Sequence, residues 1–214
     1  MKKLKVVSHV LLVMIVLLSV ALTVHYDLPV LDLVVGTTGV IYMASLSGRS
    51  IFNFLFGMVN VILYIILSYN SKLYGEAILY LLFDIPVSII AFFAWKRVVR
   101  KDFTVPTKKL HAVWLLILPI VLASFAYFYG LFLRFIGGEY VFVDALSTGV
   151  TIIATILLWK RYREQWYGWI LVYAISIIMW MMAGSALMVV ASAGCLIFSV
   201  IGLFEWRYYR RRRK

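Results

Sequence analysis

GEAILYLLFDIPVSIIAFFAW, residues 75–95, is a stretch of 21 residues with only two charged side chains. A helix needs about 20 predominantly apolar residues to cross the hydrocarbon core of a bilayer, so this stretch predicts a transmembrane helix. Four polar residues recur in it at every fourth position: Glu76, Tyr80, Asp84 and Ser88. Residues four apart share one side of a helix, so the spacing predicts a polar stripe that faces protein or water.

Seven further apolar segments of similar length lie along the chain, at 6–24, 29–46, 51–69, 110–130, 141–159, 166–183 and 185–206. The chain is 64% hydrophobic and 14% charged, whereas soluble proteins are about 25% charged. A soluble fold of this length cannot bury so much apolar surface. We therefore expect an all-α polytopic membrane protein with eight spans. Soluble enzymes and secreted disulfide scaffolds are excluded, and the single Cys195 cannot form an internal bridge.

The lysines and arginines predict the orientation in the membrane. They lie in clusters between the apolar segments, and the net charge is +12. If the N-terminus is cytoplasmic, 19 of the 21 fall on the cytoplasmic side, and only Lys72 and Arg134 fall outside. Such a bias is typical of cytoplasmic loops, so we expect both termini in the cytoplasm. No stacking platform or groove-reading motif accompanies the charge, so nucleic acid is not expected as a partner.

The first apolar segment has two interpretations. Basic residues near the N-terminus, followed by an apolar run that ends near Ser19-Val20-Ala21, resemble a signal peptide that is removed. The run is long for a signal peptide, and the next span follows at once, which favours a retained N-terminal helix. Cleavage would leave seven spans and would not change the orientation of the others.

An internal repeat organises the rest of the chain. Thr38-Gly39-Val40 recurs as Thr148-Gly149-Val150, and Trp95 and Trp206 each precede a basic cluster. One linker span between two three-helix units leaves both in the same orientation, an arrangement found in transporters whose site lies between the repeats. The predicted segments are an N-terminal helix 1–28, a first repeat 29–100, a linker helix with its loops 101–140, a second repeat 141–207 and a basic tail 208–214.

Polar residues near the centre of the spans are candidate site residues. A central Asp costs about 2.5–3.5 kcal/mol on insertion scales, so Asp84 should face protein or water. Pro86 frees a backbone carbonyl in the same helix. Asn60 is central in its span, on one face with Tyr64. These side chains either tie helices together or line a cavity for a polar solute, and the sequence leaves both interpretations open.

Aromatic residues form a stripe on the span 166–183, at spacings of three and four. Such stripes are usually packing, but Trp169 and Tyr173 lie too deep for an interfacial belt. They would offer stacking surfaces for a flat ring that carries hydroxyl groups. The candidate substrate-binding residues are Asn60, Tyr64, Tyr80, Asp84, Ser88, Trp166, Trp169 and Tyr173.

Catalytic motifs are missing from the sequence. The three histidines are scattered, and there is no P-loop, HExxH or GxSxG sequence. We expect no catalytic residue, no metal and no cofactor, and hence a transporter for a small molecule, surrounded by membrane lipids. The alternative from another class is a membrane-embedded enzyme that uses Asp84 and Glu76.

Several motifs resemble the nicotinamide riboside transporter family, PnuC, over about residues 30–210. They are NFLFGMVNVILY (53–64), LYGEAIL (73–79), VDALST (143–148), KRYREQWYGW (160–169) and GLFEWR (202–207). The resemblance implies three-plus-one-plus-three helices as in full-length SWEET carriers, preceded here by an extra N-terminal helix. It also implies a homotrimer in the bacterial cytoplasmic membrane that performs facilitated diffusion, with the solute trapped by a cytosolic kinase.

The chain departs from this family at three pocket positions. Riboside-transporting relatives tend to have an amide residue at Tyr80, Asp or Asn at Tyr173, and often Gln at Ser88, whereas Asn60 and Trp169 are retained. Tyrosines at these positions add stacking area and replace amide or carboxylate side chains that would hydrogen-bond the carboxamide of nicotinamide. The departures favour another solute of the same general class: a deoxynucleoside, thiamine or riboflavin.

Overall fold

The computed structural model describes residues 2–111 and 113–211, so residues 212–214 of the predicted basic tail lie outside it. Within the described residues, eight spans are long and apolar enough to cross a membrane, which confirms the predicted polytopic all-α class. The elements are α1 (Lys2–Tyr26), α2 (Val30–Ser47), α3 (Asn53–Asn70), α4 (Tyr74–Leu79), the π-helical turn η1 (Tyr80–Asp84), α5 (Ile85–Lys96), α6 (Trp114–Phe135), α7 (Val141–Trp159), α8 (Gln165–Met182) and α9 (Ala186–Arg211). α4, η1 and α5 together make one span.

The fifth predicted span both begins and ends too early. α6 begins at Trp114 and ends at Phe135, four to five residues later than the predicted 110–130. The preceding segment is tied to the turn between α7 and α8: the Leu110 backbone N–H donates to Glu164 Oε2 at 2.9 Å, and Lys108 forms a β-bridge with Tyr162. Apolar composition cannot distinguish such a segment from the first turn of a helix.

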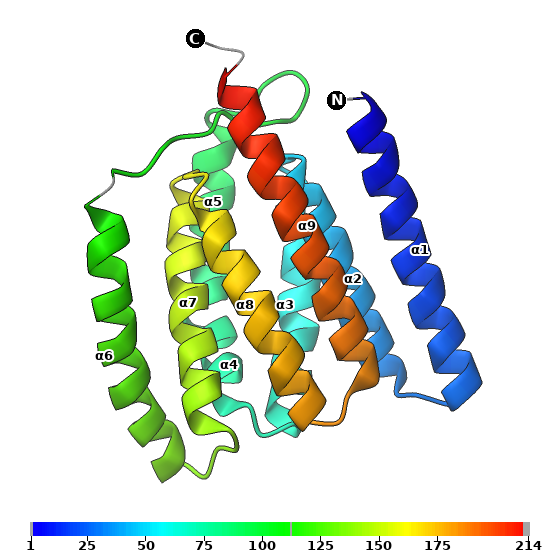
Figure 1. Cartoon of the computed structure of the whole chain (residues 1–214), viewed down its shortest axis with the longest axis vertical. Helices are drawn as coiled ribbons and strands as arrows, with labels where there is room; N and C mark the ends of the chain where they lie inside the picture. The colour runs from blue at the N-terminus through cyan, green and yellow to red at the C-terminus, as the bar shows by residue number, and fades with distance from the viewer. Residues whose placement is uncertain (1, 112, 212–214) are drawn as a thin grey trace.

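Six of the spans form a closed ring. In order around it, α2 packs on α3, α3 on α4 and α5, these on α7, α7 on α8, α8 on α9, and α9 on α2 again. Figure 1 shows the two remaining helices at opposite sides of this ring. α1 packs against α2 and α9, and α6 packs against α7. The centre of the ring is therefore the place where side chains from both halves of the chain can meet.

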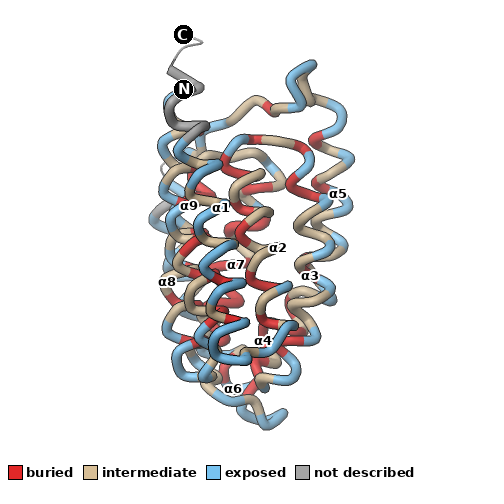
Figure 2. The backbone as a smooth tube through the Cα atoms, turned by 90° about the vertical axis from the view of Figure 1, so that its right-hand side faces the viewer, coloured by how far each residue is buried: buried red, intermediate tan, exposed pale blue. Residues whose placement is uncertain are grey.

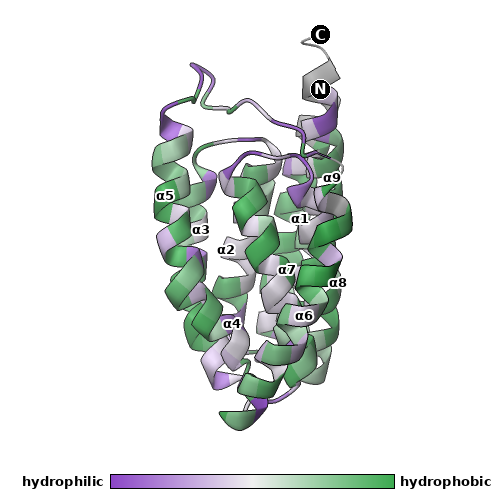
Figure 3. Ribbon diagram, turned by 90° about the vertical axis from the view of Figure 1, so that its left-hand side faces the viewer, coloured by the Kyte–Doolittle hydropathy of each residue, from purple (hydrophilic) through white to green (hydrophobic). Residues whose placement is uncertain are grey.

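Burial and hydropathy agree with a membrane setting. Buried positions lie toward the inside of the bundle in Figure 2, and Figure 3 shows apolar residues along the helices with hydrophilic ones mainly at the two ends. Large apolar side chains such as Leu17, Leu82 and Leu116 are exposed on the outside. A lipid environment makes such exposure favourable, whereas water does not. The ends of α1 and α9 that bear the termini lie at the same end of the bundle (Figure 1).

The span that contains Asp84 is wound irregularly. Tyr80–Asp84 form a π-helical turn, and the Ile85 N–H donates to the Tyr80 carbonyl instead of to that of Leu81. Pro86 follows directly and has no N–H to continue the α-helical ladder. A π-turn changes the direction of the side chains that follow it, so the four-residue spacing does not give one straight stripe.

Candidate substrate site

Two small cavities lie inside the helix ring, each of about 40 Å³. We call the one toward the end without the termini the distal cavity, and its lining is Val35, Gly36, Gly39, Asn60, Tyr64, Tyr80, Val172, Tyr173, Ser176, Met188, Ser192 and Cys195. The proximal cavity is lined by Tyr42, Phe54, Gly57, Met58, Asn60, Val61, Tyr80, Asp84, Ser88, Trp169 and Tyr173. Asn60, Tyr80 and Tyr173 belong to both. Seven of the eight predicted site residues therefore line one cavity or both.

Asn60 both ties helices together and faces the cavities. Its Nδ2 donates to the Val35 carbonyl at 2.8 Å and to Thr38 Oγ1 at 3.0 Å, which links α3 to α2. An amide NH₂ has two hydrogens, so these bonds use both. The group that Asn60 can offer to a solute is its carbonyl oxygen Oδ1, an acceptor.

Asp84 is held between the irregular span and α7. Its Oδ1 accepts a hydrogen bond from Thr155 Oγ1 at 3.1 Å, and its Oδ2 lies 3.5 Å from Ser88 Oγ. The residue is 9% exposed and lines the proximal cavity. A buried carboxylate needs such partners, and the remaining acceptor capacity on the cavity side is available to a donor or a cation.

Aromatic side chains form much of the cavity lining. Trp169 and Tyr173 on α8 stack with ring centroids 6.2 Å apart, and Trp169 Nε1 donates to Gln165 Oε1 at 3.3 Å. Tyr64 meets Tyr80 edge to face at 4.9 Å, and its hydroxyl accepts from Trp180 Nε1 at 3.2 Å. The indole and phenol rings are thus oriented by neighbours, so flat faces are presented in fixed directions.

Two residues singled out from the sequence lie elsewhere. Trp166 is fully buried, packs edge-on against Trp206 at 5.7 Å and fills the space beside Gly202, so it touches neither cavity. Glu76 is buried against α7, where its Oε1 accepts from Ser147 Oγ at 2.9 Å. Glu76 and Asp84 therefore do not converge on one cavity, which removes the basis for the membrane-enzyme alternative.

The cavities also include residues that the sequence pattern did not select. Tyr42 on α2 faces the proximal cavity, and Ser192 and Cys195 on α9 face the distal one. α2 and α9 are apolar or small at most positions, and their few polar residues show no spacing that marks one face. Only the contact between the first and last helices of the ring brings these positions to the site.

Comparison with known proteins identifies the family. A family profile described as nicotinamide mononucleotide transporter matches residues 29–208. The chain belongs to that family. The match begins at the start of α2, so it includes all six ring helices and α6, and leaves α1 outside. The resemblance inferred from the sequence motifs is confirmed.

Individual relatives within this transporter family agree. A Neisseria mucosa protein named nicotinamide riboside transporter PnuC is 32% identical over 156 residues, which cover 70% of this chain and 59% of that protein. A Haemophilus influenzae protein of the same name is 27% identical over 179 residues, covering 82% and 78%. A crystal structure described as the vitamin B3 transporter PnuC matches with a TM-score of 0.85 and 28% identity, covering 97% of this chain and 93% of that one. These proteins are named as transporters and not as enzymes, as expected.

Proposed function

We propose that the protein carries nicotinamide riboside, or a related nucleoside-type vitamin, passively across the bacterial cytoplasmic membrane through the centre of the helix ring. The supporting observation is that stacking rings, an amide oxygen and a carboxylate converge on two cavities between the halves of the chain. These groups suit a flat ring attached to a sugar. The substrate class follows the names of the relatives.

The cavities imply that transport requires a conformational change. Sites for drug-sized ligands measure about 300–1,000 Å³, whereas each cavity here has about 40 Å³, room for a water molecule or two. We infer that this is a closed form and that the two cavities merge when substrate enters. Of the three side chains that line both cavities, Asn60 is hydrogen-bonded to α2, so Tyr80 and Tyr173 are the ones that would move apart.

Each group has a proposed role in the merged site. Trp169 would stack on the ring, as aromatic side chains stack on bases elsewhere. Asn60 Oδ1 would accept a hydrogen bond from a ribose hydroxyl. Asp84 would face the positive charge of the pyridinium ring, because a carboxylate in a low-dielectric interior attracts a cation strongly. Trp166 has no role in binding in this proposal.

Transport is expected to be independent of proton and sodium gradients. A symporter needs a titratable or chelating ion site, and Asp84 is the carboxylate that lines the cavities. In this proposal the acceptor capacity that remains beside its bonds to Thr155 and Ser88 serves the solute and not a coupled ion. Purified protein in sealed liposomes should equilibrate labelled nicotinamide riboside with or without an ionophore. Collapse of uptake under the ionophore would reassign Asp84 as a proton carrier, and chemically altered solute would contradict transport itself.

Accumulation above equilibrium would then need a trapping step. We propose that a cytosolic kinase phosphorylates the solute, because the added charge cannot return along an apolar path. Liposomes loaded with ATP and a nucleoside kinase should retain more label than empty ones. Equal retention in both would argue against trapping.

A second substrate assignment rests on the two tyrosines that line both cavities. A carboxamide needs a donor and an acceptor side by side, which a phenol supplies only singly. The unsatisfied group would cost about 1–3 kcal/mol, or about ten- to hundredfold in affinity. A deoxynucleoside, thiamine or riboflavin would avoid that cost.

Competition binding tests this assignment. Nicotinamide riboside is expected to compete more weakly than one of these alternatives on the wild type and to gain about tenfold on Tyr80→Asn or Tyr173→Asp, because one carboxamide partner is restored. Tyr26→Asn, at the exposed end of α1, is the matched control and should change nothing. If the wild type prefers nicotinamide riboside over every alternative, the argument from the tyrosines is wrong and the primary proposal stands.

We propose that the ring consists of two parallel three-helix repeats, α2 to α5 and α7 to α9, joined through α6 as in SWEET carriers. Hydrogen bonds between the halves support this, because they come in matched pairs. Trp95 Nε1 donates to the Leu158 carbonyl at 3.3 Å, and Trp206 Nε1 donates to the Leu46 carbonyl at 3.3 Å. In each of these two bonds, the last helix of one repeat donates to a carbonyl near the end of the first helix of the other repeat.

A second matched pair lies at the opposite end of the bundle. Asp32, in the first turn of α2, accepts a hydrogen bond from Ser185 before α9, and Asp144, in the first turn of α7, accepts from the Gly75 N–H of α4 at 2.8 Å. Both carboxylates are buried and lie near the start of a helix, where the dipole favours negative charge. Exchanging the repeats leaves this pattern unchanged, as a two-fold axis along the membrane normal requires.

We propose that the end of the bundle with both termini faces the cytoplasm. Arg49, the basic loop after α5 and the turn after α7 lie at that end, as the positive-inside rule requires. At the other end Lys72 pairs with Glu139 at 2.7 Å, which raises the pKa of that lysine. Protease protection of terminal tags in right-side-out vesicles would test the orientation.

We further propose a homotrimer, as the family resemblance implies. α6 packs mainly on α7, with one hydrogen bond from the Tyr129 hydroxyl to the Gly75 carbonyl of α4 at 3.4 Å, and leaves large apolar side chains such as Leu116 and Phe128 exposed. Light scattering of the purified protein should give three chains per particle after correction for detergent. A monomer at all concentrations would contradict this assembly.

A further inference from the structure

A cavity with several polar lining residues lies away from the substrate site, at the end of the bundle that carries both termini. It measures about 370 Å³, within the range of about 300–1,000 Å³ that small ligands occupy. α1 forms one wall, the end of α2 with the turn to α3 a second, and α9 with the long loop after α5 the others. None of its lining residues belongs to the distal or proximal cavity.

Arg49 is the charged residue buried in this cavity, at 5% exposure. It follows Gly48 in the turn after α2 and has a left-handed backbone, with φ at 61°. Its carbonyl accepts from the Val105 N–H at 3.2 Å, and Ser50 forms a β-bridge with Thr104. The turn is therefore fixed to the long loop, and the backbone of Arg49 is held at a set place in the wall.

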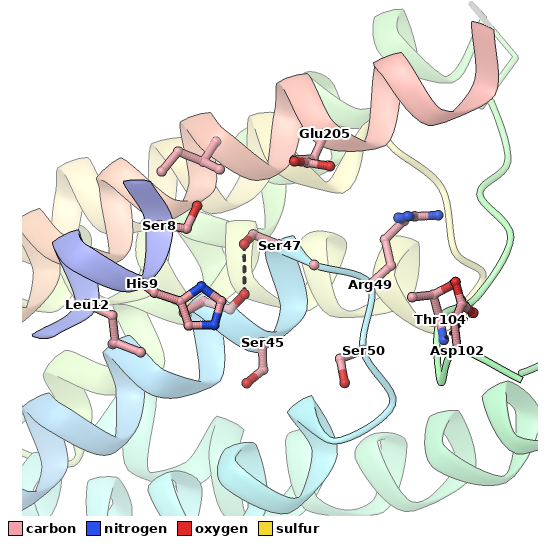
Figure 4. A pocket seen from close by; sticks show the side chains of 13 residues that line it. Ser8, His9, Leu12, Ser45, Ser47, Arg49, Ser50, Asp102, Thr104 and Glu205 are labelled. Carbon is pink, nitrogen blue, oxygen red and sulfur yellow. Dashed lines mark hydrogen bonds between the residues drawn. The ribbon is translucent and has the colours of Figure 1, made fainter. Parts of the chain in front are cut away.

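Hydroxyl groups and carboxylates complete the lining. Figure 4 shows Ser8 and His9 of α1 beside the serines at the end of α2, with Arg49 near the loop that carries Asp102 and Thr104. Thr104 donates to Asp102 and keeps the pKa of that carboxyl below its usual range, and Arg49 acts in the same direction. Glu205 on α9 supplies a second carboxylate. The cavity thus offers donors for an anion and acceptors for a cation.

The position of the cavity indicates where its ligand comes from. α1 packs on α2 and α9 alone among the described helices and lies at the edge of the bundle, so its outer side meets lipid (Figure 1). Lining residues such as Ser8, Ser47 and Glu205 lie near the ends of candidate membrane spans, where lipid headgroups would meet the bundle. The same end of the bundle carries a cluster of basic residues, such as Arg97 after α5 and Arg207 near the end of α9, which attracts anionic phosphates.

We propose that this cavity binds the headgroup of a phospholipid that bears a primary amine, with the phosphate at Arg49 and the hydroxyls of Ser45 and Ser50, and the ammonium at Glu205. Guanidinium forms bidentate, charge-assisted hydrogen bonds to phosphate, and an ammonium donates up to three bonds to carboxylate or hydroxyl oxygens. The bound headgroup bridges α1 to α2 and α9. This site is independent of the transported solute.

Two lipids that differ only at the amine provide the test. Delipidated full-length protein in detergent is titrated with phosphatidylethanolamine or phosphatidylcholine, and bound lipid is counted by native mass spectrometry. The wild type should bind the ethanolamine lipid about tenfold more tightly, because methylation removes the hydrogen bonds to Glu205. Glu205→Gln should shrink that preference. Equal binding of the two lipids by the wild type would overturn the proposal.

Variants of the cavity separate this site from general lipid adhesion. Arg49→Gln should weaken binding of both lipids about tenfold, whereas Arg134→Gln, an exposed arginine at the other end, should not. Because Arg49 is buried and its loss could unfold the protein, Ser8→Leu provides a second variant that fills the cavity from α1. Unchanged binding in Ser8→Leu and in folded Arg49→Gln would contradict the site.

A final comparison distinguishes a lipid from a soluble phosphate ester. Free phosphoethanolamine carries the same charged groups without the acyl chains. It should displace the lipid only at concentrations far above that of the lipid. If it competes at equal concentration, the ligand is a soluble ester from the aqueous side, and the lipid assignment is wrong.

Discussion

Trp169→Ala is expected to weaken substrate binding about ten- to hundredfold, because stacking of one base on an aromatic side chain contributes about 1–3 kcal/mol. Trp169 lines the proximal cavity and is oriented by Gln165 and by Tyr173. Isothermal calorimetry on the purified protein measures the loss. Trp169→Phe should recover part of it, since a smaller stacking face remains.

Trp180→Ala on the same helix is the comparison for Trp169→Ala. Trp180 is buried and lines neither cavity, but it donates to the Tyr64 hydroxyl, so a smaller loss of affinity is expected. Wild-type affinity in both variants would remove the stacking argument. A larger effect at Trp180 would move the site toward the distal cavity.

Trp166→Ala is expected to lower the free energy of unfolding by about 3–5 kcal/mol, the usual cost of deleting a buried Trp. Its indole lies against Trp206 and occupies space beside Gly202, where α8 crosses α9. Denaturant unfolding in detergent, followed by Trp fluorescence, measures this change. At temperatures where the variant is folded, its affinity for substrate should match the wild type.

Lower stability with unchanged affinity in Trp166→Ala would show that Trp166 serves helix packing and not substrate binding. A loss of affinity at Trp166 as large as at Trp169 would show that the two indoles serve one site, against the geometry. Trp159→Ala is a suitable control for both, because Trp159 lies at the end of α7 with Lys160 over its ring. It should change stability less than Trp166→Ala.

The sequence was informative about the spans because length and apolar content are what a bilayer selects. It was less informative at Leu110, which is apolar but is held in a loop by Glu164. Hydropathy reports only the transfer of a segment out of water and does not report which backbone groups are already bonded. The start of α6 therefore could not be placed from composition.

The same limit applies to the site residues. A polar side chain deep in a membrane must face protein, so the positions of Asn60 and Asp84 in their spans are enough to place both in the interior. Glu76 and Trp166 could not be separated from them by spacing. The π-turn before Pro86 changes the direction of the stripe, and a Trp packed between helices has the same periodicity as one that lines a cavity. No sequence pattern indicated Tyr42 as a site residue, because its position at the cavity depends on how α2 is rotated within the ring.

The matched hydrogen bonds between the two halves allow one half of the chain to serve as the reference for the other. If the proposed repeats descend from one duplicated ancestor, Trp95 and Trp206 are two descendants of the same residue, now at corresponding places in the two halves. A substitution in one can be compared with the identical substitution in the other, within one molecule and one lipid environment. A difference between the effects of the two substitutions on stability then measures how far the halves have diverged since duplication.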